Sequence, residues 1–265
     1  MLKVDGILKV NGILTGLTMA VVLTGCEGVF GGIYDEPDNS GEVTVNGTLY
    51  VDASDWTQWH YLDLHQLADS VAADSTYNTS LAWRTFDIPT EPLTDPAPGD
   101  RNGIYTYWYD VFGAGISVNE FRDFYATAPQ PEPESWTIAV HRNNVRTNGC
   151  EAAATGLTDI DKVPADSEYL DGLAYRADEW NERDVWVIRE RMLSGLIGNQ
   201  GMEVSPVLSS WLEVAIPPMP PAFTMNPEVF VLRLPDGTHA AIQLQDYVSS
   251  EGVKCSLTIK YRYPL

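Results

Sequence analysis

Basic residues are scarce in this sequence. Lys and Arg together number 16 against 37 Asp and Glu, which gives a formal net charge of −21 at pH 7. A surface of that sign repels phosphate backbones and anionic lipid headgroups, so nucleic acid is not an expected partner. Acidity of this kind more often serves solubility than ligand binding, and it does not by itself mark a site.

Catalytic motifs are also missing. The sequence contains no hydrolase nucleophile elbow, no HExxH, no phosphate-binding loop and no dinucleotide fingerprint. Among the four histidines, His60 and His65 are five positions apart, which on one strand puts them on opposite faces, and His239 has the outward parity of its strand. No CxxC or Cys/His cluster indicates zinc. We therefore expect a binding protein and not an enzyme, with no catalytic residues.

Cysteine is rare too, and the first of the three has a special setting. Cys26 ends the sequence LTGC at 23–26, directly after an apolar stretch at 13–23 and a start that carries Lys3 and Lys9. The stretch is too short to span a bilayer comfortably and has the length of a secretory signal. We expect a lipoprotein signal peptide, cut before Cys26, with lipid on the Cys26 thiol. An ordinary cleaved signal, or a buried helix with an incidental cysteine, is the alternative.

Three segments follow from this anchor. Residues 1–25 form the signal peptide, residues 26–41 are rich in Gly, Pro and acid and form a flexible tether, and residues 42–265 form one domain. Outside the cytoplasm the other two cysteines, Cys150 and Cys255, can oxidise. They either join in a disulfide or remain two buried free thiols.

Strand patterns dominate the domain, which predicts an all-β, antiparallel fold with long loops and little helix. The end of the chain is the clearest part: strands at 228–234, 239–245 and 254–263 form a three-stranded meander, the first turn being Pro-Asp-Gly. One short helix is expected after Ser117. The other predicted strands are 43–52, 56–64, 81–86, 103–111, 136–146, 185–192 and 211–214.

A basic corner stands out in this acidic protein. An apolar strand that starts at Trp136 runs through His141 directly into Arg142, and Arg146 follows four residues later. Half-buried arginines of this kind usually pair with carboxylates or backbone carbonyls. We interpret the four residues as a fold-defining corner, with ligand contact as the alternative.

Two methionines lie where soft metal ligands could be presented. Met219 is surrounded by four prolines in WLEVAIPPMPPAF, which makes it the tip of a stiff loop between two strands. Met192 ends a predicted strand before a Gly-containing loop at 194–201. If both loops lie at one end of the sheet, the two thioethers can face each other, and thioether sulfur suits haem iron. The alternative is that both methionines fill apolar gaps.

Four pieces of the sequence together resemble the HmuY family of Bacteroidetes lipoproteins. They are YVDASDWTQWHYLDL, WTIAVHRNNVRTNG, WLEVAIPPMPPAF, and VFVLRLPDGTHAAIQLQDY with the closing strand SLTIKYRYP. The second and fourth pieces, in this order behind a lipidation motif, are the most specific. The resemblance covers about residues 49–265 and implies an all-β fold, which the strand patterns predict independently.

The resemblance implies haem as the ligand, held between two loops by two axial side chains. The best-known member is a haemophore that works with a TonB-dependent outer-membrane receptor and uses histidines, and some relatives use methionines. This chain has no histidine in the second loop, so the resemblance points to Met219 and to Met192, with Met202 as a substitute for Met192. Arg189 and Arg191 are the residues that could contact the haem propionates. A non-haem binding or accessory surface lipoprotein on the same scaffold is the alternative function.

Overall fold

A computed structural model describes residues 44–90, 106–110, 129–181, 184–188, 196–216, 218 and 220–265. The chain divides into two compact units, Met1–Glu42 and Val43–Leu265, of which only the second contains described residues. The predicted signal peptide, the tether and the short helix after Ser117 lie outside the described residues. Within the described part of the chain, no helix is long and apolar enough to cross a membrane.

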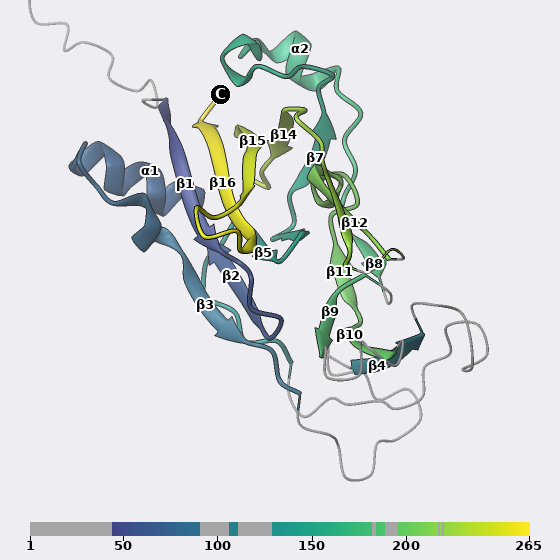
Figure 1. Ribbon diagram of the computed structural model, residues 1–265. Coiled ribbons are helices and arrows are strands. Elements are labelled where there is room, and N and C mark those ends of the chain that lie inside the picture. Colours follow the sequence, from purple (N-terminus) through teal and green to yellow (C-terminus); the bar gives the residue numbers. More distant parts are fainter. Residues whose placement is uncertain are drawn as a thin grey trace, which may run out of the picture. The chain divides into compact units, whose positions relative to one another are not determined.

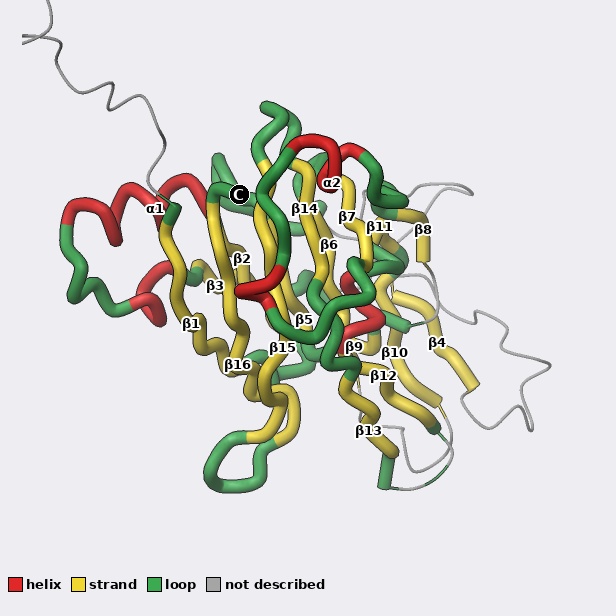
Figure 2. The backbone as a smooth tube through the Cα atoms, turned by 90° about the horizontal axis from the view of Figure 1, so that it is seen from above, coloured by secondary structure: helices red, strands yellow, loops and turns green. Residues whose placement is uncertain are grey.

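The domain is built from antiparallel sheets (Figures 1 and 2), as the sequence predicted. The five-stranded sheet has the order β1 (Val45–Asp52), β16 (Lys254–Tyr263), β15 (His239–Val248), β14 (Phe230–Arg233) and β7 (Glu151–Ala154). The four-stranded sheet has the order β3 (Arg84–Asp87), β2 (Gln58–Leu62), β5 (Ile138–His141) and β6 (Asn144–Thr147).

Smaller sheets and short helices complete the domain. The sheets are β4 (Thr106–Asp110) with β10 (Leu196–Gln200) and β9 (Trp186–Ile188), β11 (Met202–Val204) with β8 (Glu179–Asn181), and β12 (Leu212–Ala215) with β13 (Ala222–Met225). The helices are α1 (Leu64–Ala73), α2 (Ser167–Asp171) and the 3-10 helices η1 (Thr79–Ala82), η2 (Ile160–Lys162) and η4 (Leu208–Trp211).

The predicted meander forms the centre of the five-stranded sheet. Alternate residues of β16 are buried from Cys255 to Tyr263, and the residues between them are partly exposed. The buried side chains of β16 and β1 pack against those of β2 and β5 in one apolar cluster, so this cluster joins the two larger sheets face to face. Burial of these apolar side chains is the main source of the domain's stability.

The structure corrects three predicted elements. The strand predicted at 136–146 is a hairpin, β5 and β6, because Arg142 turns the chain with a φ of 55°. The loop predicted at 194–201 contains β10, which pairs with β9. The strand predicted at 56–64 ends at Leu62, and α1 begins at Leu64, because the Asp63 carboxylate accepts hydrogen bonds from the first backbone N–H groups of the helix. His65 therefore lies on a helix and not on the strand of His60.

The two cysteines of the domain are buried free thiols, which is the second of the two alternatives. Cys150 precedes β7 and Cys255 is the second residue of β16, and two strands, β15 and β14, separate β7 from β16. The register also puts the two cysteines at opposite ends of the sheet. Glu151, next to Cys150, faces Arg233, and Arg233 faces His239. His239 lies beside the end of β16, whereas Cys255 lies near its start. Neighbouring strands are about 4.8 Å apart, so the two sulfurs are far beyond the reach of a disulfide.

A half-buried carboxyl group attaches β8 to the four-stranded sheet. Asp178 precedes β8, and its two oxygens accept hydrogen bonds from the backbone N–H of Thr147 at 2.6 Å and from the Thr147 hydroxyl at 3.0 Å. The same hydroxyl lies 3.0 Å from the carbonyl oxygen of Cys150. Burial raises the pKa of Asp178 to about 6, although the bonds from Thr147 act in the opposite direction.

Gly47 provides a test of the packing between β1 and β16. It faces Tyr261 across the strand pair, and a Cβ atom on Gly47 would lie 2.9 Å from Cε1 of the buried Tyr261 ring. We predict that Gly47→Ala lowers the free energy of unfolding by about 1–3 kcal/mol, because the ring must move within a packed core. Urea denaturation measures the change. The exposed neighbour Asn46→Ala is the control, and equal stability of the two variants would contradict the packing.

Asp178 gives a pH-dependent prediction. Its pKa is raised from 3.8 in its ordinary state to about 6 in the folded chain, so its contribution to stability is full below about pH 4 and is lost as the pH rises through about 6. We predict that the stability of the wild type, relative to Asp178→Asn, falls by roughly 2 kcal/mol between those limits. Urea unfolding of both proteins at pH 4, 5, 6 and 7 measures this. A difference that is constant with pH would show that the carboxyl group is not perturbed.

Candidate binding site

Two hairpins carry the predicted ligand residues. The connection between β9 and β10 spans 189–195 and contains Arg189, Arg191 and Met192; the connection between β12 and β13 contains Met219. These four residues lie outside the described part of the chain, and the structure neither brings them together nor separates them. The strands on which the connections begin and end are described, apart from the side chains at 188, 196 and 197.

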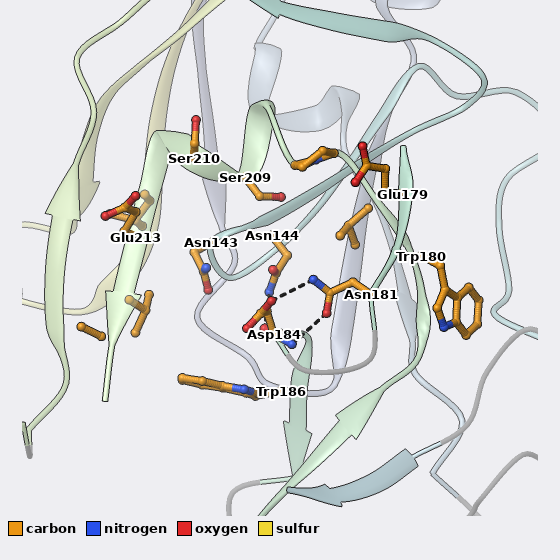
Figure 3. Close-up of a pocket in the computed structure, with 15 residues that line it drawn as sticks. Asn143, Asn144, Glu179, Trp180, Asn181, Asp184, Trp186, Ser209, Ser210 and Glu213 are labelled. Atoms are coloured by element: carbon orange, nitrogen blue, oxygen red, sulfur yellow. Dashed lines mark hydrogen bonds between the residues drawn. The ribbon is translucent and has the colours of Figure 1, made fainter. Parts of the chain in front are cut away.

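One cavity, of about 510 Å³, is bordered by both hairpins (Figure 3). Trp186 in β9 lines it, and so do Val214 and Ala215 at the end of β12. The connections that contain Met192 and Met219 therefore both begin within a few residues of the same cavity. Ligand pockets typically have volumes of roughly 300–1,000 Å³, so the space is of the usual size.

The part of the cavity lining formed by Asn144, Asn181 and Asp184 is polar and preorganised. The Asn181 side chain donates to a carboxylate oxygen of Asp184 at 2.8 Å and accepts from the Asp184 backbone N–H at 3.0 Å. Asn144, from the turn end of the β5–β6 hairpin, donates its amide N–H to the Asp184 carbonyl at 2.9 Å. These bonds fix the start of β9 against the four-stranded sheet. The charged residues among the described lining are all acidic, namely Glu179, Asp184 and Glu213.

Aromatic stacking holds Trp186 at the other side of the cavity. The Trp186 ring is stacked on Trp56, with ring centroids 6.5 Å apart and planes 16° apart. The guanidinium carbon of Arg142 lies 4.1 Å from the Trp56 ring centroid, and Arg142 also donates to the carbonyl oxygen of Ser54 at 2.7 Å. Cation–π contacts of this kind are stabilising. The stack fixes the orientation of Trp186, whose ring gives the cavity one broad apolar face.

The basic corner makes the contacts of a structural element. His141 is completely buried, with Nε2 2.9 Å from the carbonyl oxygen of Trp56, and burial lowers its pKa to about 3, so it is neutral. Arg146 forms an ion pair with Glu132 at 2.5 Å and lies 4.9 Å from the ring centroid of the buried Trp136. None of the side chains of Trp136, His141, Arg142 and Arg146 lines the cavity.

Met202, the substitute for Met192, is a core residue. It lies on β11, is 4% exposed, and packs in the apolar cluster that contains Trp59, Tyr61 and Trp136. It does not line the cavity. The structure thus gives Met202 the gap-filling role that methionines commonly have in cores.

The β12–β13 hairpin is attached to the five-stranded sheet by a second stack. Phe223 on β13 lies parallel to Tyr247 on β15, with ring centroids 5.7 Å apart, and the Lys254 ammonium is 4.8 Å from the Tyr247 ring centroid. The base of the hairpin that contains Met219 is therefore fixed by side-chain packing. Neither this stack nor the role of Trp186 was predicted from the sequence. The signal that the sequence offers for them is the presence of aromatic residues on the strands beside the segments that contain Met192 and Met219.

Known proteins resemble the chain in sequence and in fold. The sequence profile of the HmuY protein family matches residues 55–261. A protein assigned as HmuY-like and haem-binding, from Bacteroides vulgatus, is 27% identical, with a TM-score of 0.55 over 83% of this chain and 92% of that one. A protein assigned as a lipoprotein, from Bacteroides fragilis, is 26% identical, with a TM-score of 0.56 over 83% and 90%.

A more distant structure, the apo HmuY analog of Tannerella forsythia, is 20% identical with a TM-score of 0.56 over 84% of this chain and 97% of that one, and it supports the fold alone. A search among curated proteins gave no match. In the described residues, no group of three or more His, Cys, Asp or Glu side chains could hold a metal ion. The family profile covers most of the chain and the fold agrees with it: the chain belongs to the HmuY family.

Proposed function

We propose that this protein binds haem between its two hairpins, through Met192 and Met219 as axial ligands, and serves haem and iron acquisition. The observation that carries the proposal is the shared cavity: Trp186 and Ala215, on the two hairpins, line the same space. Family membership and the haem-binding assignment of the Bacteroides vulgatus relative agree with it.

The described lining fits part of a haem. The half-buried ring of Trp186 and the side chain of Val214 offer apolar contact to a flat ring. The carboxylates of Asp184 and Glu213 repel propionates, so the propionates point away from these two residues. Arg189 and Arg191 follow β9 directly and supply the cations that the described lining lacks. Two neutral thioethers hold the iron best in its reduced state.

Haem titration tests this proposal. We predict that the purified mature chain in detergent gives a saturable shift of the Soret band with haemin, stronger after dithionite reduction. Met192→Ala and Met219→Ala should each weaken binding of reduced haem at least about tenfold, since a lost axial ligand costs more than 1.4 kcal/mol. Met225→Ala, on β13 of the same hairpin, is the matched control.

The outcomes separate the two parts of the proposal. Absence of a Soret shift in both oxidation states would overturn haem binding. A normal shift that neither methionine variant weakens would overturn the ligand assignment and leave haem binding in place. The polar part of the cavity lining favours the second candidate function, binding of a polar non-haem ligand or partner, because its side chains are amides, hydroxyls and acids. A null titration together with recovery of a partner from outer membranes supports that function.

The proposed location is the outer membrane, with lipid on Cys26 as the anchor and a TonB-dependent receptor as the partner that receives haem. The LTGC sequence at 23–26 and the lipoprotein assignment of the Bacteroides fragilis relative support the anchor. Lipid attached to the protein chain adds membrane affinity in proportion to the buried CH₂ groups.

Replacing the anchor residue tests the location. We predict that Cys26→Ser abolishes incorporation of radiolabelled palmitate and moves the protein from the membrane fraction to the soluble fraction. The domain begins well after residue 26, so the variant should retain haem binding in the Soret titration. Unchanged membrane association of Cys26→Ser would contradict the lipid anchor.

A further inference from the structure

The cavity that the two hairpins border has charges of one sign in its described lining. Glu179 is paired with Arg176, whose Nη2 lies 2.6 Å from Glu179 Oε1. Asp184 and Glu213 are exposed, and neither has an ion-pair partner among the described residues. No lysine, arginine or histidine of the described chain lines the cavity. These two carboxylates therefore attract a positively charged group from outside the chain.

Many side-chain donors in the lining are already used within the protein. The amide N–H groups of Asn144 and Asn181 both donate to Asp184, the first to its carbonyl oxygen and the second to its carboxylate. The hydroxyls of Ser209 and Ser210 donate to backbone carbonyl oxygens. What these side chains still offer to a ligand is mainly oxygen acceptors, so the lining favours a ligand rich in N–H donors.

Asn144 contributes an acceptor that is fixed in place. Its side chain lines the cavity although the residue is only 3% exposed. The atom 2.9 Å from the Asp184 carbonyl oxygen must be the amide nitrogen, because a carbonyl only accepts, and so the other atom of the amide is the oxygen Oδ1. Within the described chain Oδ1 accepts no side-chain hydrogen bond, and it is not one of the fully buried atoms that lack a partner. A donor in the cavity can therefore reach it.

The acceptors and an aromatic ring border the same part of the cavity (Figure 3). Asn144 is bonded to the backbone of Asp184, which brings its amide oxygen to the side of the cavity that carries the Asp184 carboxylate. Trp186, two residues further along the chain, lines the same cavity and is held by its stack on Trp56. An indole ring attracts cations as well as apolar groups.

The donor set decides which kind of cation fits. In the described residues no group of three or more His, Cys, Asp or Glu side chains could hold a metal ion. One amide oxygen, one carboxylate and an aromatic ring suit a cation that brings its own N–H donors and a carbon chain. Ammonium and guanidinium groups have both properties.

We propose that this part of the cavity binds an organic cation, a primary ammonium or guanidinium group that donates hydrogen bonds to the Asn144 amide oxygen and the Asp184 carboxylate beside the Trp186 ring. The group belongs either to a small amine or to a lysine or arginine side chain of a protein partner. A net charge of −21 attracts both. The proposal rests on the second candidate function, binding of a polar ligand or partner, and specifies its ligand. It requires neither haem nor the two methionines.

Ligand-observed NMR with the purified mature chain in nonionic detergent tests the proposal. The probes are butylammonium and butylguanidinium at pH 7, with butanol and butanoate as the neutral and anionic controls of equal chain length. N-acetyl-lysine amide and N-acetyl-arginine amide represent the side chains of a protein partner. We expect saturation transfer to the cations at millimolar concentration, and at least about tenfold weaker binding of butanol and butanoate, because only the cations form charge-assisted hydrogen bonds.

Two matched variants locate the cation. Asp184→Asn removes the charge but keeps the shape, and its backbone can still bond to Asn144 and Asn181. We expect this variant to bind the cations about threefold to tenfold more weakly, since the lost contact is charge-assisted but made by an exposed carboxylate. Glu203→Gln makes the same change of charge on an exposed residue outside the lining, and it should bind as the wild type does. Equal thermal stability of Asp184→Asn and the wild type checks folding.

Three results would overturn the proposal. They are no transfer to any cation, equal affinity for butanol and butylammonium, and equal weakening by Asp184→Asn and Glu203→Gln, which would indicate general attraction to an acidic surface. Tighter binding of the amino-acid amides would support a protein side chain as the source of the cation, and tighter binding of the free amines would support a small molecule. The haem titration and its methionine variants are separate measurements, so failure of haem binding and failure of cation binding remain distinguishable.

Discussion

The buried face of β16 is the constraint on which the rest of the domain depends. Alternate side chains from Leu257 to Tyr263 fill the space between the two larger sheets, and β16 is hydrogen-bonded to β1 on one side and to β15 on the other. A shift of one residue in either pairing would move every one of these side chains to the outer face. The register of β16 therefore sets the position of both neighbours.

The two hairpins of the candidate haem site depend on this frame through side-chain stacks. Tyr247 on β15 holds Phe223 and with it the β12–β13 hairpin. On the other side, the β5–β6 corner holds Trp56 through Arg142, and Trp56 holds Trp186 on β9. The same corner supplies Asn144, which bonds to the start of β9. Both hairpins are thus fixed at their bases, which is what preorganised binding between their ends requires.

The sequence predicted the elements whose pattern is local. The meander was predictable because β16 alternates strictly and because Pro235, Asp236 and Gly237 form a recognisable turn. The β5–β6 turn was not, since its left-handed residue is Arg142 and not glycine. α1 was missed because the alternation of β2 leads directly into it, although Asp63 is a good helix-capping residue. The cavity and the aromatic stacks join residues that are far apart in the chain, and no local pattern shows them.

The free thiols of Cys150 and Cys255 have a consequence for how the fold responds to its surroundings. Burial raises the pKa of both thiols, that of Cys150 to about 12, so almost no thiolate is present at neutral pH and alkylating or oxidising reagents find no reactive sulfur in the folded domain. No covalent bond links the strands that contain them, so the folded state has the same stability in reducing and oxidising compartments. Their modification by a thiol reagent therefore reports opening of the β-sheet core, and its rate is a direct measure of how often the sheets separate.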